Sequence, residues 1–135
     1  MKTRRLRGLL AIPASVALLI AAVPSHAVSG CHVPPFHGAV SSAGAVATMN
    51  VVNTGRACRI DNYGVPATRG NPAEAGQVTT APEHGTAAFD APAVRYTPAP
   101  GYVGDDAFDY IANAKGNLDQ RVTLKVHVDV HVTAP

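Results

Sequence analysis

The final stretch of the chain alternates apolar and polar residues without a break. Val122, Leu124, Val126, Val128, Val130 and Val132 alternate with Thr123, Lys125, His127, Asp129 and His131. A period of two over eleven residues predicts a long β-strand with one buried face and one solvated face. No window of comparable length has helical spacing. The chain is therefore expected to be all-β.

Shorter strand signals precede this stretch and are separated by turn residues. We expect them at residues 45–52, 57–61, 77–81, 86–89, 93–97 and 107–113. The turn signal Asn53-Thr54-Gly55 predicts that the first two of these strands form a hairpin. About seven short strands, with a turn every eight to twelve residues, predict an antiparallel β-sandwich.

Aromatic residues are concentrated between Val94 and Tyr110. This stretch holds three of the four tyrosines, and the chain has no tryptophan. Because large aromatic side chains dominate core energetics, we expect the core to form here. Tyr102 lies at the tip of a Pro/Gly turn, so it is the aromatic residue expected to be exposed and available for binding a partner.

The N-terminal segment has the pattern of a secretory signal peptide. A basic start is followed by an apolar run over residues 9–23 and by small residues at a cleavage site after Ala27. Residues 1–27 are therefore expected to be removed, leaving 28–135 as one domain with residues 28–44 as an extended arm. We expect the product to be secreted or periplasmic, and no later run is apolar enough to span a membrane.

Removal of the signal peptide reverses the net charge. Four of the eleven basic residues leave with it and none of the nine acidic ones, so +2 becomes −2 (seven minus nine). Binding to nucleic acid needs a clustered positive face, so it is not expected.

The two cysteines, Cys31 and Cys58, allow two interpretations. An even number of cysteines in an exported chain favours a disulfide. Alternatively, Val28-Ser29-Gly30-Cys31 fits the pattern read by the lipoprotein signal peptidase, which would place a lipid anchor on Cys31.

The run from Tyr96 to the final strand resembles the end of a bacterial immunoglobulin-like or cadherin-like repeat. The shared features are a Tyr-x-Pro turn at Tyr96, the pattern Gly104-x-Asp106-x-Phe108-x-Tyr110, a glycine hairpin at Gly116 and a final alternating strand. The resemblance covers about residues 77–132. It implies an immunoglobulin-like sandwich and a non-enzymatic adhesion, spacer or carbohydrate-associated role.

Candidate sites for chemistry are few. None of the serines after residue 27 lies in a Gly-x-Ser-x-Gly elbow. Asp105, Asp106 and Asp109 are read as a turn that bonds its own backbone, with surface calcium binding as the alternative. His127, Asp129 and His131 share one strand face and are candidate zinc or copper ligands, although the two histidines lie about 13 Å apart along a flat strand.

These observations favour a non-enzymatic binding or structural module that contacts a protein or a surface glycan and needs no cofactor. The alternative is a small periplasmic metal-binding protein that uses the His-x-Asp-x-His strand. A hydrolase built on the Asp105–Asp109 turn is the third hypothesis.

Overall fold

A computed structural model describes residues 30–135, so the expected signal peptide lies outside the described residues. The described chain contains eight strands and no helix. The strands are β1 (Cys31–His32), β2 (Ala45–Val52), β3 (Cys58–Asp61), β4 (Ala75–Thr80), β5 (Gly85–Asp90), β6 (Ala93–Pro98), β7 (Gly104–Lys115) and β8 (Arg121–Thr133). One strand more than expected is present, because the arm contributes β1. Residues 30–135 accordingly include no helix that could cross a membrane.

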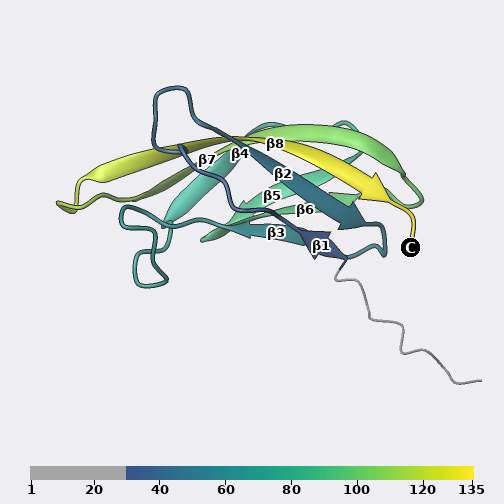
Figure 1. Cartoon of the computed structure of the whole chain (residues 1–135), viewed down its shortest axis with the longest axis horizontal. Helices are drawn as coiled ribbons and strands as arrows, with labels where there is room; N and C mark the ends of the chain where they lie inside the picture. Colours follow the sequence, from purple (N-terminus) through teal and green to yellow (C-terminus); the bar gives the residue numbers. More distant parts are fainter. Residues whose placement is uncertain (1–29) are drawn as a thin grey trace, which may run out of the picture.

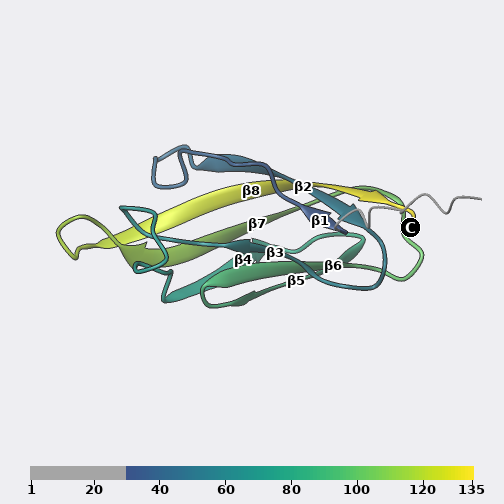
Figure 2. The same ribbon diagram turned by 60° about the horizontal axis from the view of Figure 1, so that its bottom comes forward.

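The strands form two sheets packed face to face. The larger sheet has the order β1-β2-β8-β7-β4 and the smaller one the order β3-β6-β5. Figures 1 and 2 show β8, β7 and β2 in one layer and β3, β5 and β6 in the other. This arrangement confirms the all-β sandwich and its immunoglobulin-like form.

The long β7–β8 hairpin forms the inner part of the larger sheet. Its register runs without a break from Gly104 opposite Val132 to Lys115 opposite Arg121. Leu124, Val126, Val128, Val130 and Val132 of β8 are all buried, and the residues between them point outward. The alternation of the sequence is thus confirmed as one core face and one solvated face.

Aromatic rings from the two sheets meet in the centre of the core. Tyr96 of β6 and Phe108 of β7 are fully buried, and their ring centroids lie 5.8 Å apart in a stacked arrangement. Tyr110 is also buried and donates a hydrogen bond of 2.7 Å to Asn62 Oδ1. The core therefore lies where the concentration of aromatic residues predicted it.

The expected hairpin between β2 and β3 is wrong. β2 pairs in parallel with β8 in the larger sheet, whereas β3 pairs with β6 in the smaller one. The turn at Asn53 does not reverse the chain within a sheet but carries it across the sandwich. Asn53 fixes this crossing, because its Nδ2 donates to the carbonyls of Ala99 and Tyr102. The sandwich is consequently not purely antiparallel.

The part of the arm that follows β1 closes one open side of the sandwich. β1 pairs with the end of β2, and Lys125 N–H donates to the carbonyl of Ala39 at the other end of the arm. Between these points Val33 and Phe36 pack against the core. The arm therefore covers the side between β2 and β3 that both sheets would otherwise leave open.

Candidate functional site

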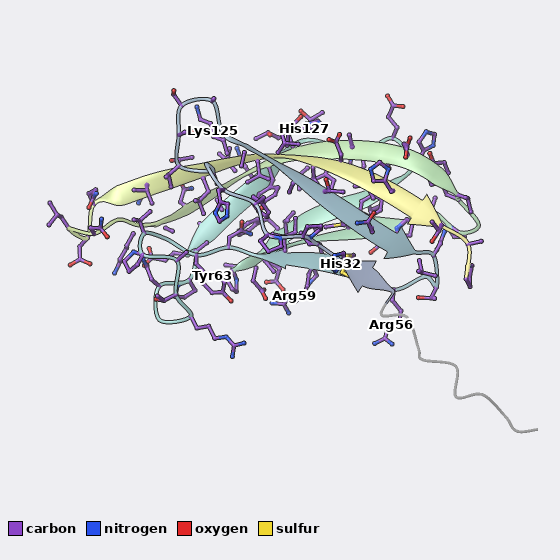
Figure 3. All side chains as sticks on the ribbon, viewed as in Figure 1. His32, Arg56, Arg59, Tyr63, Lys125 and His127 are labelled. Atoms are coloured by element: carbon purple, nitrogen blue, oxygen red, sulfur yellow. A yellow bond between two sulfur atoms is a disulfide. The ribbon has the colours of Figure 1, made fainter. Side chains whose placement is uncertain are left out.

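The outer face of the larger sheet carries a group of alternating acids and imidazoles. Asp105 and Asp109 of β7 lie directly opposite His131 and His127 of β8 in the strand register. Asp129 lies on β8 between the two histidines and points to the same side. We call these five residues the His–Asp face. Figure 3 shows His127 projecting from the outer side of β8, next to Lys125.

Each histidine of the His–Asp face is held by a carboxylate of the neighbouring strand. His127 Nδ1 lies 2.7 Å from Asp109 Oδ1, and His131 Nδ1 lies 2.6 Å from Asp105 Oδ1. The second nitrogen of His127, Nε2, lies 3.3 Å from Asp129 Oδ1. The imidazole of His127 therefore sits between two carboxylates, an arrangement that favours the ring with both nitrogens protonated.

The same geometry alters the acidity of His127. The hydrogen bond to Asp109 raises the pKa of His127, partial burial opposes the rise, and the charges of Asp109 and Asp129 add to it. The side chains of His127 and Asp109 remain 44% and 38% exposed, so water screens their attraction. His127 thus places an imidazole whose charge depends on pH on the outer face of the larger sheet.

The candidate metal ligands do share one strand face, as expected. However, His127 and His131 occupy separate positions along β8, and each turns its Nδ1 toward its own partner on β7. Within residues 30–135, no three His, Cys, Asp or Glu side chains converge in a way that could hold a metal ion. The structure therefore does not bring the candidate ligands together.

The three candidate calcium ligands are also divided. They belong to strand β7 rather than to a turn, and successive residues of a strand point to opposite faces. Asp105 and Asp109 point outward to the histidines, whereas Asp106 is buried on the core side. Three carboxylates that face different ways do not supply converging oxygen ligands.

Asp106 instead fastens the turn between β4 and β5. Its two carboxylate oxygens accept hydrogen bonds from the N–H groups of Glu83, His84 and Ala107 and from the hydroxyl of Tyr96, each 2.9 Å long. Burial by itself would raise the pKa of Asp106, but the four donors outweigh it and hold the pKa below its ordinary value. Asp106 is therefore an ionised structural anchor.

Tyr102 lies at one end of the sandwich and is half-buried rather than fully exposed. Its ring stacks on that of His84, with centroids 4.3 Å apart and planes within 6°, and its hydroxyl donates to the carbonyl of Asp105. Next to this stack, the loops around Asn53, His84 and Pro100 enclose a cleft of about 690 Å³. Only part of the ring of Tyr102 is thus left for a partner.

A second groove, of about 640 Å³, runs between the arm and β3. Its walls are mainly apolar and include Val33, Phe36, Ile60 and Leu124. It begins beyond the point where the arm and β3 are joined by the disulfide. A groove of this size falls within the range of ligand sites, but its lining does not single out one class of ligand.

The disulfide between Cys31 and Cys58 is confirmed, with the two Cα atoms 5.2 Å apart. It joins β1 of the larger sheet to β3 of the smaller one, so it is a bond between the layers. It also uses the Sγ atom of Cys31 that the alternative, a lipid anchor, would need.

Sequence reasoning missed the residues that complete the His–Asp face. The sequence pattern groups Asp109 with Asp105 and Asp106, whereas its partner in the structure is His127, 18 residues away. The hairpin turn at residues 116–120 was the available signal, because counting outward from it along both strands places Asp109 opposite His127.

Comparison with protein families gave one match. Residues 36–127 match the model of a family described as "Bacterial Ig domain". The match is more than half of the chain and reaches well to the N-terminal side of the expected resemblance at 77–132. Comparison with curated proteins and with solved structures gave no significant match.

Proposed function

The chain belongs to the bacterial immunoglobulin-domain family, and from this membership we propose that it is an exported module that contacts a protein or a glycan of the cell surface. Domains of this family are typically binding or structural modules rather than enzymes. The proposal extends that general role to export and to a surface partner. The expected signal peptide and the disulfide both support export, since disulfides persist in oxidising compartments.

The main support for the proposal is that the reactive side chains of residues 30–135 are engaged in bonds within the fold. Both cysteines form the disulfide, and Asp106 is saturated by four donors inside the fold. The histidines on β8 are hydrogen-bonded to carboxylates on an exposed strand face, and among the described residues neither imidazole is hydrogen-bonded to a hydroxyl or a thiol. Such an arrangement supports recognition by a rigid surface better than it supports catalysis.

Two surfaces are suited to recognition. The His–Asp face offers carboxylates and imidazoles at the surface of the two longest strands. The cleft beside the His84–Tyr102 stack offers an aromatic pair and backbone groups at a loop end, where rigid scaffolds commonly present binding residues. These two surfaces are the ones to change in a binding experiment.

Capture of partners by the immobilised exported protein tests the proposal. Protein and glycan fractions of the cell envelope would be passed over the wild type, over the double variant D109N/D129N and over the double variant H84A/Y102A. We expect a partner that binds the wild type and loses at least about tenfold in affinity, roughly 1.4 kcal/mol, with one of the two variants. If the immobilised wild type captures no protein and no glycan from any fraction, the proposed role is contradicted.

A further inference from the structure

The two sheets have four edges, and three of them are covered or interrupted. β1 has only two residues, and the arm runs on from it along the same side. β3 faces the arm across the groove and is tied to it by the disulfide. β4 has a register shift between Val78 and Thr80, and such a bulge is a common way to blunt a strand edge.

β5 is the edge without such protection. It runs for six residues, Gly85–Asp90, in unbroken register with β6. It contains no proline and no basic residue, and Asp90 at its end is its single charge. Figure 2 shows β5 along the lower border of the molecule, and none of the strands in residues 30–135 lies beyond it in its sheet.

The burial of β5 indicates that a neighbouring strand would fit. Its inward-pointing residues Ala87 and Phe89 are only half-buried, whereas the corresponding residues of the central strand β6, Val94 and Tyr96, are fully buried. Alternate backbone N–H and C=O groups of an edge strand point away from the sheet and lack a partner strand. The ring of Phe89 packs against Gly76 of β4 and lies 6.2 Å from that of Tyr110, between centroids. An added strand would pair the free backbone groups and cover the part of Phe89 that is still exposed.

We propose that β5 is a self-association edge, at which two copies of this chain pair their β5 strands antiparallel about a two-fold axis through Ala88. The three strands of the smaller sheet in each copy then form one continuous sheet across the dimer. Pairing of this kind is strand addition at an open edge, and the two-fold axis makes the contact closed.

The sequence of β5 is complementary to itself in this register. On the inner side, the large ring of Phe89 lies opposite the small Ala87 of the second copy. On the outer side, Asp90 lies opposite Thr86 of the second copy, so no like charges face each other and the hydroxyl can donate to the carboxylate. Ala88, on the axis, meets only Ala88 of the second copy. A shift by one residue would place inner residues opposite outer ones.

This inference rests on the proposed binding role and names one partner for it. Because a contact between two six-residue strands is small, we expect a weak dimer with a dissociation constant of roughly 100 µM. Sedimentation equilibrium of the exported protein, from about 10 µM to about 1 mM, measures it directly.

Two charge variants of one exposed position supply the specific test. A88K and A88E each place like charges opposite each other across the axis, so each should raise the dissociation constant by about fivefold or more. An equal mixture of A88K and A88E should restore association, because the opposed charges are then of opposite sign. Q77K, which adds the same charge to the edge of β4, should leave the dimer unchanged. Unchanged thermal unfolding of each variant shows that the fold is intact.

Three results of these experiments would overturn the proposed pairing of β5. A protein that stays monomeric to about 1 mM overturns the inference. A dimer that A88K leaves intact, or that Q77K disrupts, also overturns it, because another surface is then used. None of these results touches the capture of envelope partners, so the proposed role stands or falls separately.

Discussion

His127 Nδ1 lies 2.7 Å from Oδ1 of Asp109, its direct neighbour across the β7–β8 hairpin. The two residues are 18 positions apart in sequence. Their contact links the solvated faces of the two longest strands. Since the ring is also within 3.3 Å of Asp129, protonation of His127 completes a row of alternating charges.

Replacing Asp109 by asparagine should lower the pKa of His127. The hydrogen bond to Asp109 is the largest cause of the raised value, and an amide cannot offer the same charge. Proton NMR of the His127 ring over pH 5–9 measures the change. As a matched control, D119N removes a carboxylate from the β7–β8 turn and should leave the titration of His127 unaltered. An unchanged pKa in D109N would show that the contact with Asp109 is not made in solution.

The same contact makes the stability of the domain depend on pH. A histidine with a raised folded pKa binds its proton more tightly in the folded state. Its contribution to the free energy of unfolding is therefore fully present below the pKa of the unfolded state, about 6.5, and is lost as pH rises through the pKa of the folded state. Because the pair is partly exposed, the contribution should be less than about 1 kcal/mol. Urea unfolding at several pH values should show the difference between wild type and H127N shrinking from pH 6 to pH 9. A difference that grows over this range would contradict the predicted sign.

Replacing Asp106 by asparagine should destabilise the domain by about 2–4 kcal/mol, because a buried carboxylate that accepts four hydrogen bonds is replaced by a group with one acceptor and an unwanted donor. Since the folded pKa of Asp106 is lowered, its contribution is present above the unfolded pKa of about 3.9 and is lost as pH falls through the folded value. Y96F removes one of the four donors and should cost less, about 1–2 kcal/mol. Equal effects of D106N and Y96F in denaturant unfolding would argue against this network.

Removing the disulfide with C31A/C58A should lower the free energy of unfolding by about 3–4 kcal/mol in the chain-entropy model. The bridge closes a loop with a sequence separation of 27 residues and holds β1 of one sheet against β3 of the other. Denaturant unfolding of the double variant beside the wild type measures the loss. Intact mass of the exported protein, two hydrogens below the reduced value, is the companion measurement, and an added lipid mass would contradict the disulfide.

Zinc or copper titration should give no dissociation constant tighter than about 1 mM. The imidazoles of His127 and His131 are held by separate carboxylates at separate positions along β8, so they do not form a chelating pair. Calorimetry with the wild type and with H127N/H131N measures this. Micromolar binding that disappears in the double variant would revive the metal-binding alternative.

Much of the fold followed from local patterns. The alternation from Val122 to Val132 predicted β8 and its buried face, because side chains on a strand point alternately to opposite sides. The concentration of aromatic residues predicted the place of the core, and Phe108 and Tyr110 are both buried in it. The even cysteine count predicted the disulfide, and the motif from Tyr96 to Tyr110 pointed to the family.

The strand partners did not follow from local patterns. Residues 45–52 and 57–61 have the turn of a hairpin between them, yet they belong to different sheets. A turn signal shows where the chain bends but not whether the next strand pairs with the last one or crosses the core. That choice depends on burying the inner faces of both sheets at once, which is a property of the whole domain.

For the surface residues, too, one part followed from the sequence and another part only from the tertiary structure. The sequence by itself determined which residues of β8 face water, since that depends only on a period of two. Only the tertiary structure decided that Asp109 holds His127, Asp105 holds His131 and Asp106 turns inward to Tyr96. The physical reason is that hydrogen bonds and ion pairs act over a few ångströms of space, and the distance along the chain does not report which side chains come that close.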